Sequence, residues 1–155
     1  MRDRRFVREH RGGTLTLEQH QQLIRWACSC AKHVLPLFGE KIDKRLINAL
    51  IVAKEWENSH ASVEDARKAS VDAHAIARES SNPISIAIAR SIGHAIATAH
   101  MADHSLGAAL YALKAVKNAG KSIEAEREWQ NEQLPLRIKE LILTTRSVKE
   151  KYLKV

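Results

Sequence analysis

The tetrapeptide His-Ala-Ile-Ala occurs twice in this chain, at residues 74–77 and 94–97, and each copy lies in an alanine-rich stretch. In each copy an alanine also precedes the histidine by five residues, so the same helical face is written twice. Between residues 61 and 119, 17 of the 59 residues are alanine, and such small side chains allow helix backbones to approach closely. The repeat therefore predicts an alanine-rich, antiparallel pair of helices at the centre of the molecule.

Apolar residues elsewhere in the chain also recur at helical spacing, and almost nothing has the alternation that is typical of a strand. Residue types that cap helix N-termini stand at the starts of six expected helices, at Thr16, Asp43, Ser62, Asn82, Asp103 and Ser122. The last helix contains Pro135, which must kink or restart it because an interior proline costs about 3 kcal/mol. We therefore expect an all-α, single-domain bundle of about six helices.

Two of these helices indicate how the core is built. In the second, Leu46, Ile47, Leu50 and Ile51 follow the i, i+3, i+4 spacing of one buried stripe. The fourth, at about 83–101, is apolar nearly all round, which is typical of a helix at the centre of a bundle.

The net charge of +7 is located at the two ends of the chain. Residues 1–11 hold five arginines and two carboxylates, a net of +3, and residues 137–155 hold six basic residues and two carboxylates, a net of +4. We interpret these segments as a basic N-terminal arm, 1–13, and as the basic C-terminal end, 137–155, of a helical domain that spans 14–155. Solvated tails are the simplest interpretation of the charge, and a weak electrostatic contact with nucleic acid is the alternative.

The N-terminal residues carry charge without the apolar region of a signal peptide, and no apolar run approaches the ~20 residues of a membrane span. Cys28 and Cys30 would point about 200° apart on one helix, so they can neither pair with each other nor hold one metal ion. We therefore expect a cytoplasmic protein with reduced thiols and no membrane partner.

Histidines and arginines are arranged in rows along the two halves of the repeat. At helical spacing they form one polar seam between the paired helices, made of Arg67, His74, Arg78, Arg90, His94 and Thr98. In an antiparallel pair, His74 would lie near the level of His94, and Arg78 would approach Arg90. Such a seam could bind an anion or a small ligand, or it could satisfy its hydrogen bonds within the fold, as most buried polar groups do.

The sequence lacks the known patterns for catalysis or metal binding. His100 and His104 have the i, i+4 spacing of a metal-binding pair, but Asp103 indicates a helix break between them, and no third ligand follows in a known pattern. Neither a glycine-rich phosphate loop nor a Gly-x-Ser-x-Gly elbow occurs. We therefore expect no enzymatic activity, no cofactor and no bound metal, with a small-ligand or metal protein that uses the seam as an alternative.

Several longer phrases allow a more specific comparison. They are His10-Arg11-Gly12-Gly13, Glu18-Gln19-His20, Trp26-Ala27-Cys28, His33 through Phe38, Gly93 through Ala112, Glu128-Trp129-Gln130 and Gln133-Leu134-Pro135. Together they resemble the bacterial putative immunity protein family, which has an Imm-5-like helical domain. The resemblance covers nearly the whole chain, and Gly93 through Ala112 is its most specific part.

The resemblance implies a small cytosolic protein that binds and silences a toxin of a polymorphic toxin system. Because inhibitors of nuclease toxins are more often acidic, the basic charge implies either another kind of toxin or a contact through the neutral body. Interfaces favour aromatic residues, and Tyr111 and Trp129 are the candidates here. We therefore expect a non-enzymatic protein that binds a cognate toxin, with a homodimer as a further option. The alternative is a nucleic-acid-associated helical protein that uses its basic termini.

Overall fold

The computed structural model describes residues 2–153, so the last two residues of the expected basic end, 154–155, lie outside the described part. The described residues are all-helical and contain no strand. Seven α-helices are present in them: α1 (Leu17–Val34), α2 (Lys44–Glu57), α3 (Val63–Glu79), α4 (Pro83–Ala97), α5 (His104–Asn118), α6 (Ile123–Glu132) and α7 (Leu136–Leu153). Three 3-10 turns complete the chain: η1 (Arg4–Phe6), η2 (Glu9–Arg11) and η3 (Leu35–Leu37).

The described residues hold seven α-helices where about six were expected, because the last expected helix is two helices. Pro135 lies between α6 and α7, so of the two outcomes expected there, a kink or a restart, the structure shows the restart. A proline lacks the backbone N–H that a continuing helix requires, which explains the restart at Leu136. The all-α fold class itself is confirmed.

Side-chain caps begin most of the helices. At Thr16 a reciprocal capping box is formed, in which Gln19 N donates to Thr16 Oγ1 at 3.1 Å and Thr16 N donates to Gln19 Oε1 at 2.9 Å. Asp43, Ser62, Asn82 and Ser122 also cap their helices, as predicted.

The cap expected at Asp103 is wrong. Asp103 precedes α5, but its side chain accepts no capping hydrogen bond, and its backbone has φ −69° and ψ −15°. A capping residue needs an extended backbone to turn its side chain back onto the first turn. Asp103 instead belongs to a nearly helical turn that begins at Thr98. Helix α4 ends before this turn, at Ala97, and not at the expected residue 101.

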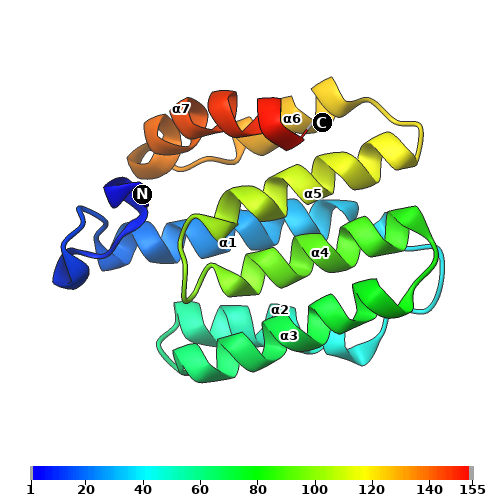
Figure 1. The fold of residues 1–155 in the computed structure, drawn as a ribbon, viewed down its shortest axis with the longest axis horizontal. Coiled ribbons are helices and arrows are strands. Elements are labelled where there is room, and N and C mark those ends of the chain that lie inside the picture. The colour runs from blue at the N-terminus through cyan, green and yellow to red at the C-terminus, as the bar shows by residue number, and fades with distance from the viewer. Residues whose placement is uncertain (1, 154–155) are drawn as a thin grey trace.

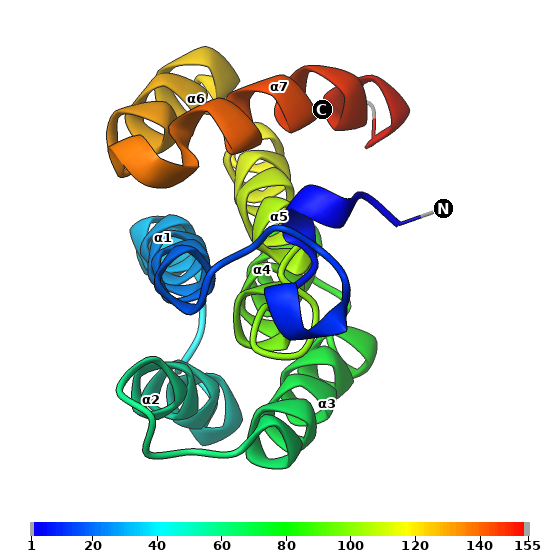
Figure 2. The same ribbon diagram turned by 90° about the vertical axis from the view of Figure 1, so that its left-hand side faces the viewer.

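The helices lie in three tiers, as Figure 2 shows: α6 and α7 in the first, α1, α4 and α5 in the second, α2 and α3 in the third. In Figure 1, α4 runs between α3 and α5 and contacts both. Its residues Ile88, Ile92 and Ile96 are fully buried or nearly so, which confirms that α4 is the apolar centre. None of the described helices is both long and apolar enough to span a membrane.

The stripe predicted on α2 is only partly correct. Leu46 is fully buried, but Ile47 and Ile51 are 41% and 51% exposed. Helix α2 lies at an edge of the bundle, so only one side of it packs against other helices. The two isoleucines extend the apolar stripe beyond that contact.

The N-terminal arm is folded onto the bundle, so its interpretation as a solvated tail is wrong. Phe6 is 2% exposed and Leu15 1% exposed, and both belong to a core cluster with α1, α5 and α7. Backbone hydrogen bonds hold the arm in a loop, with Leu15 N donating to Val7 O at 2.9 Å and Glu9 N donating to Leu15 O at 3.1 Å.

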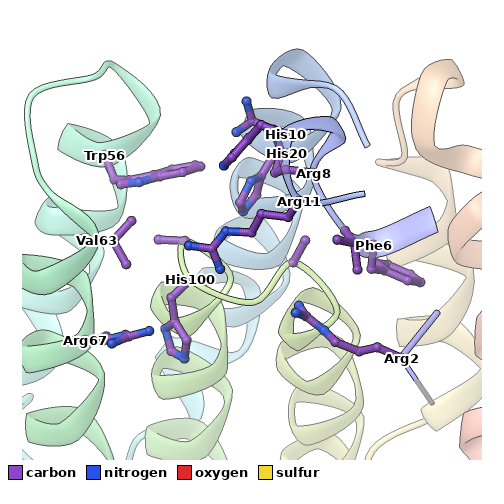
Figure 3. A pocket seen from close by; sticks show the side chains of 13 residues that line it. Arg2, Phe6, Arg8, His10, Arg11, His20, Trp56, Val63, Arg67 and His100 are labelled. Atoms are coloured by element: carbon purple, nitrogen blue, oxygen red, sulfur yellow. The ribbon is translucent and has the colours of Figure 1, made fainter. Parts of the chain in front are cut away.

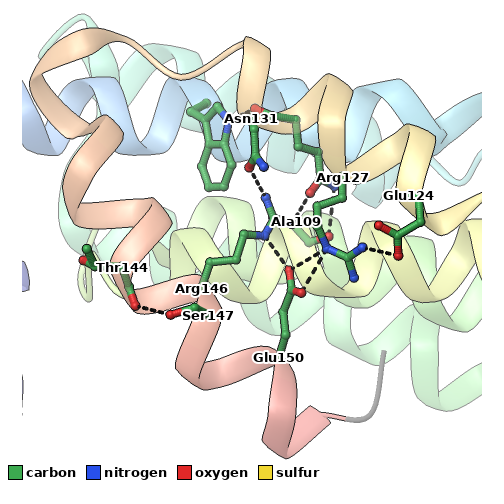
Figure 4. A network of polar contacts seen from close by, with 10 residues as sticks. Ala109, Glu124, Arg127, Asn131, Thr144, Arg146, Ser147 and Glu150 are labelled. Carbon is green, nitrogen blue, oxygen red and sulfur yellow. Dashed lines mark hydrogen bonds and ion pairs between the residues drawn. The ribbon is translucent and has the colours of Figure 1, made fainter.

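A buried arginine joins α6 and α7, as Figure 4 shows. Arg146 is 3% exposed and donates to Glu150 Oε1 at 2.6 Å, to Asn131 Oδ1 at 2.8 Å and to Gln130 Oε1. Gln130 Nε2 in turn donates to the carbonyl oxygen of Ala109 on α5 at 3.0 Å. The network thus compensates the cost of burying a guanidinium and fastens the α6–α7 tier to the rest of the bundle.

Candidate functional site

The two histidines of the repeat meet between α3 and α4. The rings of His74 and His94 lie 5.4 Å apart between centroids, at an angle of 86°. Glycines make room for both rings. A Cβ at Gly93 would lie 2.6 Å from the His74 ring, and a Cβ at Gly107 of α5 would lie 2.5 Å from His94 Nδ1. Any larger residue at either position would have to displace an imidazole.

Hydrogen bonds fix the protonation of these rings. Arg90 Nη1 lies 2.8 Å from His74 Nδ1. Because a guanidinium can only donate, His74 Nδ1 must accept and carry no proton. His94 Nδ1 lies 3.0 Å from Nδ1 of His104, so one of these two nitrogens donates and the other accepts.

Two further rings extend the arrangement along α5 and the turn before it. Tyr111 stacks on His94, with centroids 5.2 Å apart and an angle of 19°. The ring of His100 lies 5.6 Å from that of His104. We call the set His74, Arg90, His94, His100, His104 and Tyr111 the histidine cluster.

The imidazoles of the cluster are held neutral. Burial, followed by the nearby charges of Arg90, His104 and Arg78, lowers the pKa of His74 to about 4. Burial, followed by His104 and His74, lowers the pKa of His94 to about 3. Burial also lowers the pKa of His100 and His104, although Asp103 opposes this for His104. At neutral pH the cluster therefore offers neutral donors and acceptors, with Arg90 as its one permanent charge.

A cavity of about 300 Å³ opens beside the cluster. It is lined by His94, Met101, Asp103, His104, Gly107, Leu110, Tyr111 and Lys149. Asp103 Oδ1 is buried without a hydrogen-bond partner among the described residues. The cavity therefore combines an aromatic and imidazole wall with one negative and one positive side chain.

Only half of the predicted seam comes together. His74 contacts both Arg90 and His94, as described above. Arg78 is exposed on α3 and is not a member of the cluster, although its charge helps to lower the pKa of His74. Thr98 is fully buried; its Oγ1 donates to the carbonyl oxygen of His94 at 3.1 Å, and its own carbonyl oxygen accepts from His20 Nε2 on α1 at 2.6 Å.

Arg67 lies in a different place from the rest of the seam. It lines a second cavity, at the end of the bundle, together with His100 and residues of the N-terminal arm, as Figure 3 shows. The seam predicted from helical spacing is therefore divided between two sites.

His104 and Tyr111 belong to the cluster, although neither was predicted there: His104 was considered only with His100 as a metal pair that was set aside, and Tyr111 only as a partner contact. Residues 104, 107 and 111 have the i, i+3, i+7 spacing of one face of α5. This spacing, with a glycine between two ring-bearing residues, is the sequence pattern that could have predicted that His104 and Tyr111 share one face of α5.

Trp129, the other aromatic candidate, is half-buried on α6. Its ring stacks on His33 with centroids 3.5 Å apart and an angle of 6°, and His33 Nδ1 lies 2.6 Å from Glu126 Oε2. Trp129 thus joins α6 to the end of α1 and keeps part of its surface in solvent.

Cys28 and Cys30 are not paired with each other, as expected, and both are buried. Burial raises the pKa of Cys28 to about 12, so its thiol is not a nucleophile at neutral pH. In the described part of the chain, no three potential ligands from His, Cys, Asp and Glu converge in a way that could hold a metal ion.

Comparison with known proteins places this chain in a family. No curated protein and no solved structure matches it. A family model described as "Imm-5 like putative immunity protein" matches residues 13–137, which include α1 to α6 and every member of the histidine cluster. The chain therefore belongs to the Imm-5-like putative immunity protein family.

Proposed function

We propose that this protein is an immunity protein that binds and neutralises a cognate bacterial toxin, without catalysis of its own. The membership of residues 13–137 in the Imm-5-like family carries the proposal. A buried α4 that packs between α3 and α5 supports it, because a rigid, preformed fold loses little entropy on binding.

The toxin contact is centred on Tyr111 and the cavity beside it. Tyr111 is half-buried, stacks on His94, and has Lys114 Nζ 5.9 Å from its ring centroid. Aromatic residues that are anchored on one side and open on the other dominate the energy of many interfaces. Lys149 at the rim of the same cavity adds a positive charge for an acidic group of the toxin.

Trp129 forms the second candidate contact. Its stacking on His33 holds the indole in place, so little side-chain entropy is lost when a partner covers it. The two aromatics lie on α5 and α6, which are neighbours in the fold.

The test is to search the reading frames beside this gene for a toxin, to co-express the protein with it, and to measure binding on the purified pair. We expect rescue of growth by the unaltered protein. Tyr111→Ala should weaken the complex by more than tenfold, and Trp129→Ala should do so to a similar or smaller extent, as at interface hot spots of about 2 kcal/mol.

Matched variants separate the contact from the fold. Tyr111→Phe keeps the ring and should keep the affinity for the toxin. Ile51→Ala is the control for a surface away from the contact, because it removes an exposed apolar side chain from α2, in the tier opposite α6 and α7. An unrescued culture, with no complex at micromolar concentrations, would refute the proposed function. Rescue by the unaltered protein, with Tyr111→Ala and Trp129→Ala binding the toxin as tightly as it does, would instead refute the assigned surface.

A further inference from the structure

The cavity that holds Arg67 lies where the N-terminal arm closes over one end of the bundle. It has a volume of about 120 Å³. Figure 3 shows its side chains arriving from the arm, from α1, α2 and α3, and from the turn between α4 and α5. This volume exceeds the roughly 30 Å³ share of one water molecule, so the cavity has room for a small ion of several atoms.

The lining of this cavity is strongly basic. Four arginines line it, namely Arg2, Arg8, Arg11 and Arg67, together with His10, His20 and His100. The lining residues include no aspartate or glutamate. Among the described ion pairs none involves these four arginines, whereas six other arginines of the chain are paired. Such a concentration of unpaired positive charge favours an anion.

Three buried nitrogens of the lining have no hydrogen-bond partner among the described residues: Arg8 Nε, His20 Nδ1 and His100 Nδ1. An unpaired buried donor is costly, and native structures rarely leave one. Arg8 Nε can only donate, so its partner must accept.

His20 requires the opposite kind of partner. The ring is 5% exposed, and its Nε2 donates to the carbonyl oxygen of Thr98 at 2.6 Å. Burial lowers the pKa of His20 to about 4, so the ring is neutral and Nδ1 is an acceptor. A group that satisfies both Arg8 and His20 must therefore accept and donate at once.

We propose that this cavity binds a phosphate group that keeps one O–H, as hydrogen phosphate or as the protonated end of a phosphomonoester. The arginines neutralise its charge and donate to its oxygens, and its O–H donates to His20 Nδ1. A carboxylate or a sulfate fits the arginines equally well but has no proton for His20. The indole of Trp56, whose ring lies 4.7 Å from that of His20, forms the apolar wall of the site. The site is independent of the proposed toxin contact, which uses other residues.

Calorimetric titration of the full chain at constant ionic strength tests the proposal, with inorganic phosphate, sulfate and acetate as probes. We expect phosphate to bind with a Kd at or below about 1 mM, and sulfate and acetate to bind several-fold more weakly because a neutral hydrogen bond is lost. Adenosine monophosphate distinguishes the sources: binding tighter than that of inorganic phosphate assigns an ester, and weaker binding assigns the free ion.

The double variant Arg8→Gln/Arg67→Gln should weaken phosphate binding by at least tenfold, because two charge-assisted hydrogen bonds are lost. The control is Lys44→Gln/Lys68→Gln, which removes the same charge at exposed positions that do not line the cavity and should leave the affinity unchanged. Thermal unfolding without phosphate checks that both variants fold. Equal losses in the two variants, equal affinity for sulfate, or binding of an oligonucleotide but not of phosphate would overturn the proposal.

Discussion

Two glycines decide where the imidazoles of the histidine cluster can lie. Gly93 leaves the space that His74 fills from α3, and Gly107 leaves the space that His94 fills from α4. Both glycines are inside helices, where glycine costs up to about 1 kcal/mol relative to alanine. Glycine therefore lowers the intrinsic stability of α4 and α5 at these positions, but it allows the imidazole rings to pack closely against the helix backbones.

Gly93→Ala should destabilise the protein by about 1–3 kcal/mol, since overpacking outweighs the better helix propensity of alanine. Urea unfolding measures the effect. Gly39→Ala is the control, because a Cβ at Gly39 would meet nothing within 4 Å. The double variant Gly93→Ala/His74→Ala should recover part of the loss, as coupled neighbours do. A stabilising effect of Gly93→Ala alone would show that the His74 ring moves aside without cost.

At the scale of helices, the sequence predicted the elements well where local chemistry decides them. The capping box at Thr16 involves residues three apart, and Pro135 stops a helix wherever it is placed. The side chain of Asp103 failed as a cap because the turn before it is itself nearly helical. That conformation depends on how α5 folds back against α4, which no local pattern contains.

The same distinction applies to the candidate site. His74 and His94 could be paired from the repeat, because helical spacing fixes which residues share a face. The contact of His94 with His104 and the placement of Arg67 in another cavity depend on the turn at 98–103 and on the arm. Those features are tertiary, so the spacing of residues within one helix could not reveal them.

The α6–α7 connection depends on Arg146. Arg146→Ala should cost about 3 kcal/mol, because it removes three hydrogen bonds of a buried guanidinium and leaves Gln130 Oε1 buried without a partner, whereas Glu150 keeps its contact with Arg127. Arg137→Ala is the control at the start of the same helix. It removes an ion pair with Glu18 whose side chains are 64% and 55% exposed, and should cost under about 1 kcal/mol. Equal costs in urea unfolding would show that the buried network does not stabilise the bundle.

For the molecule as a whole, the position of its charge differs from the simplest interpretation of the sequence. The arm that carries five arginines is packed against the bundle through Phe6, and several of these arginines surround a cavity. At the other end, Arg137 and Arg146 are paired with carboxylates. Folding thus brings three arginines of the arm and Arg67 of α3 together around one cavity, instead of leaving the arm as a solvated tail.

The buried histidines also set how stability depends on pH. The pKa values of His20 and His74 fall from an ordinary 6.5 to about 4, and that of His94 falls to about 3. Below pH 6.5 the unfolded chain therefore binds protons that the folded chain does not. Stability is unaffected by these groups above pH 6.5 and decreases as the pH falls from 6.5 towards 4.

Replacing one of these histidines should flatten that dependence. Each buried histidine contributes up to about 1.4 kcal/mol per pH unit to the slope, since one proton per molecule is involved. We expect His94→Gln to reduce the slope of the unfolding free energy between pH 5 and pH 7, measured by urea unfolding, whatever its effect on stability at pH 7. His60→Gln, at an exposed position between α2 and α3, should leave the slope unchanged.

The slope is the informative quantity because the two effects of His94→Gln depend differently on pH. The loss of packing at residue 94 lowers the unfolding free energy equally at every pH. The difference in bound protons between the unfolded and the folded chain changes with pH, and only this difference sets the slope. An unchanged slope in His94→Gln would mean that this ring is protonated in the folded cluster, against the neutral Nδ1 contact between His94 and His104.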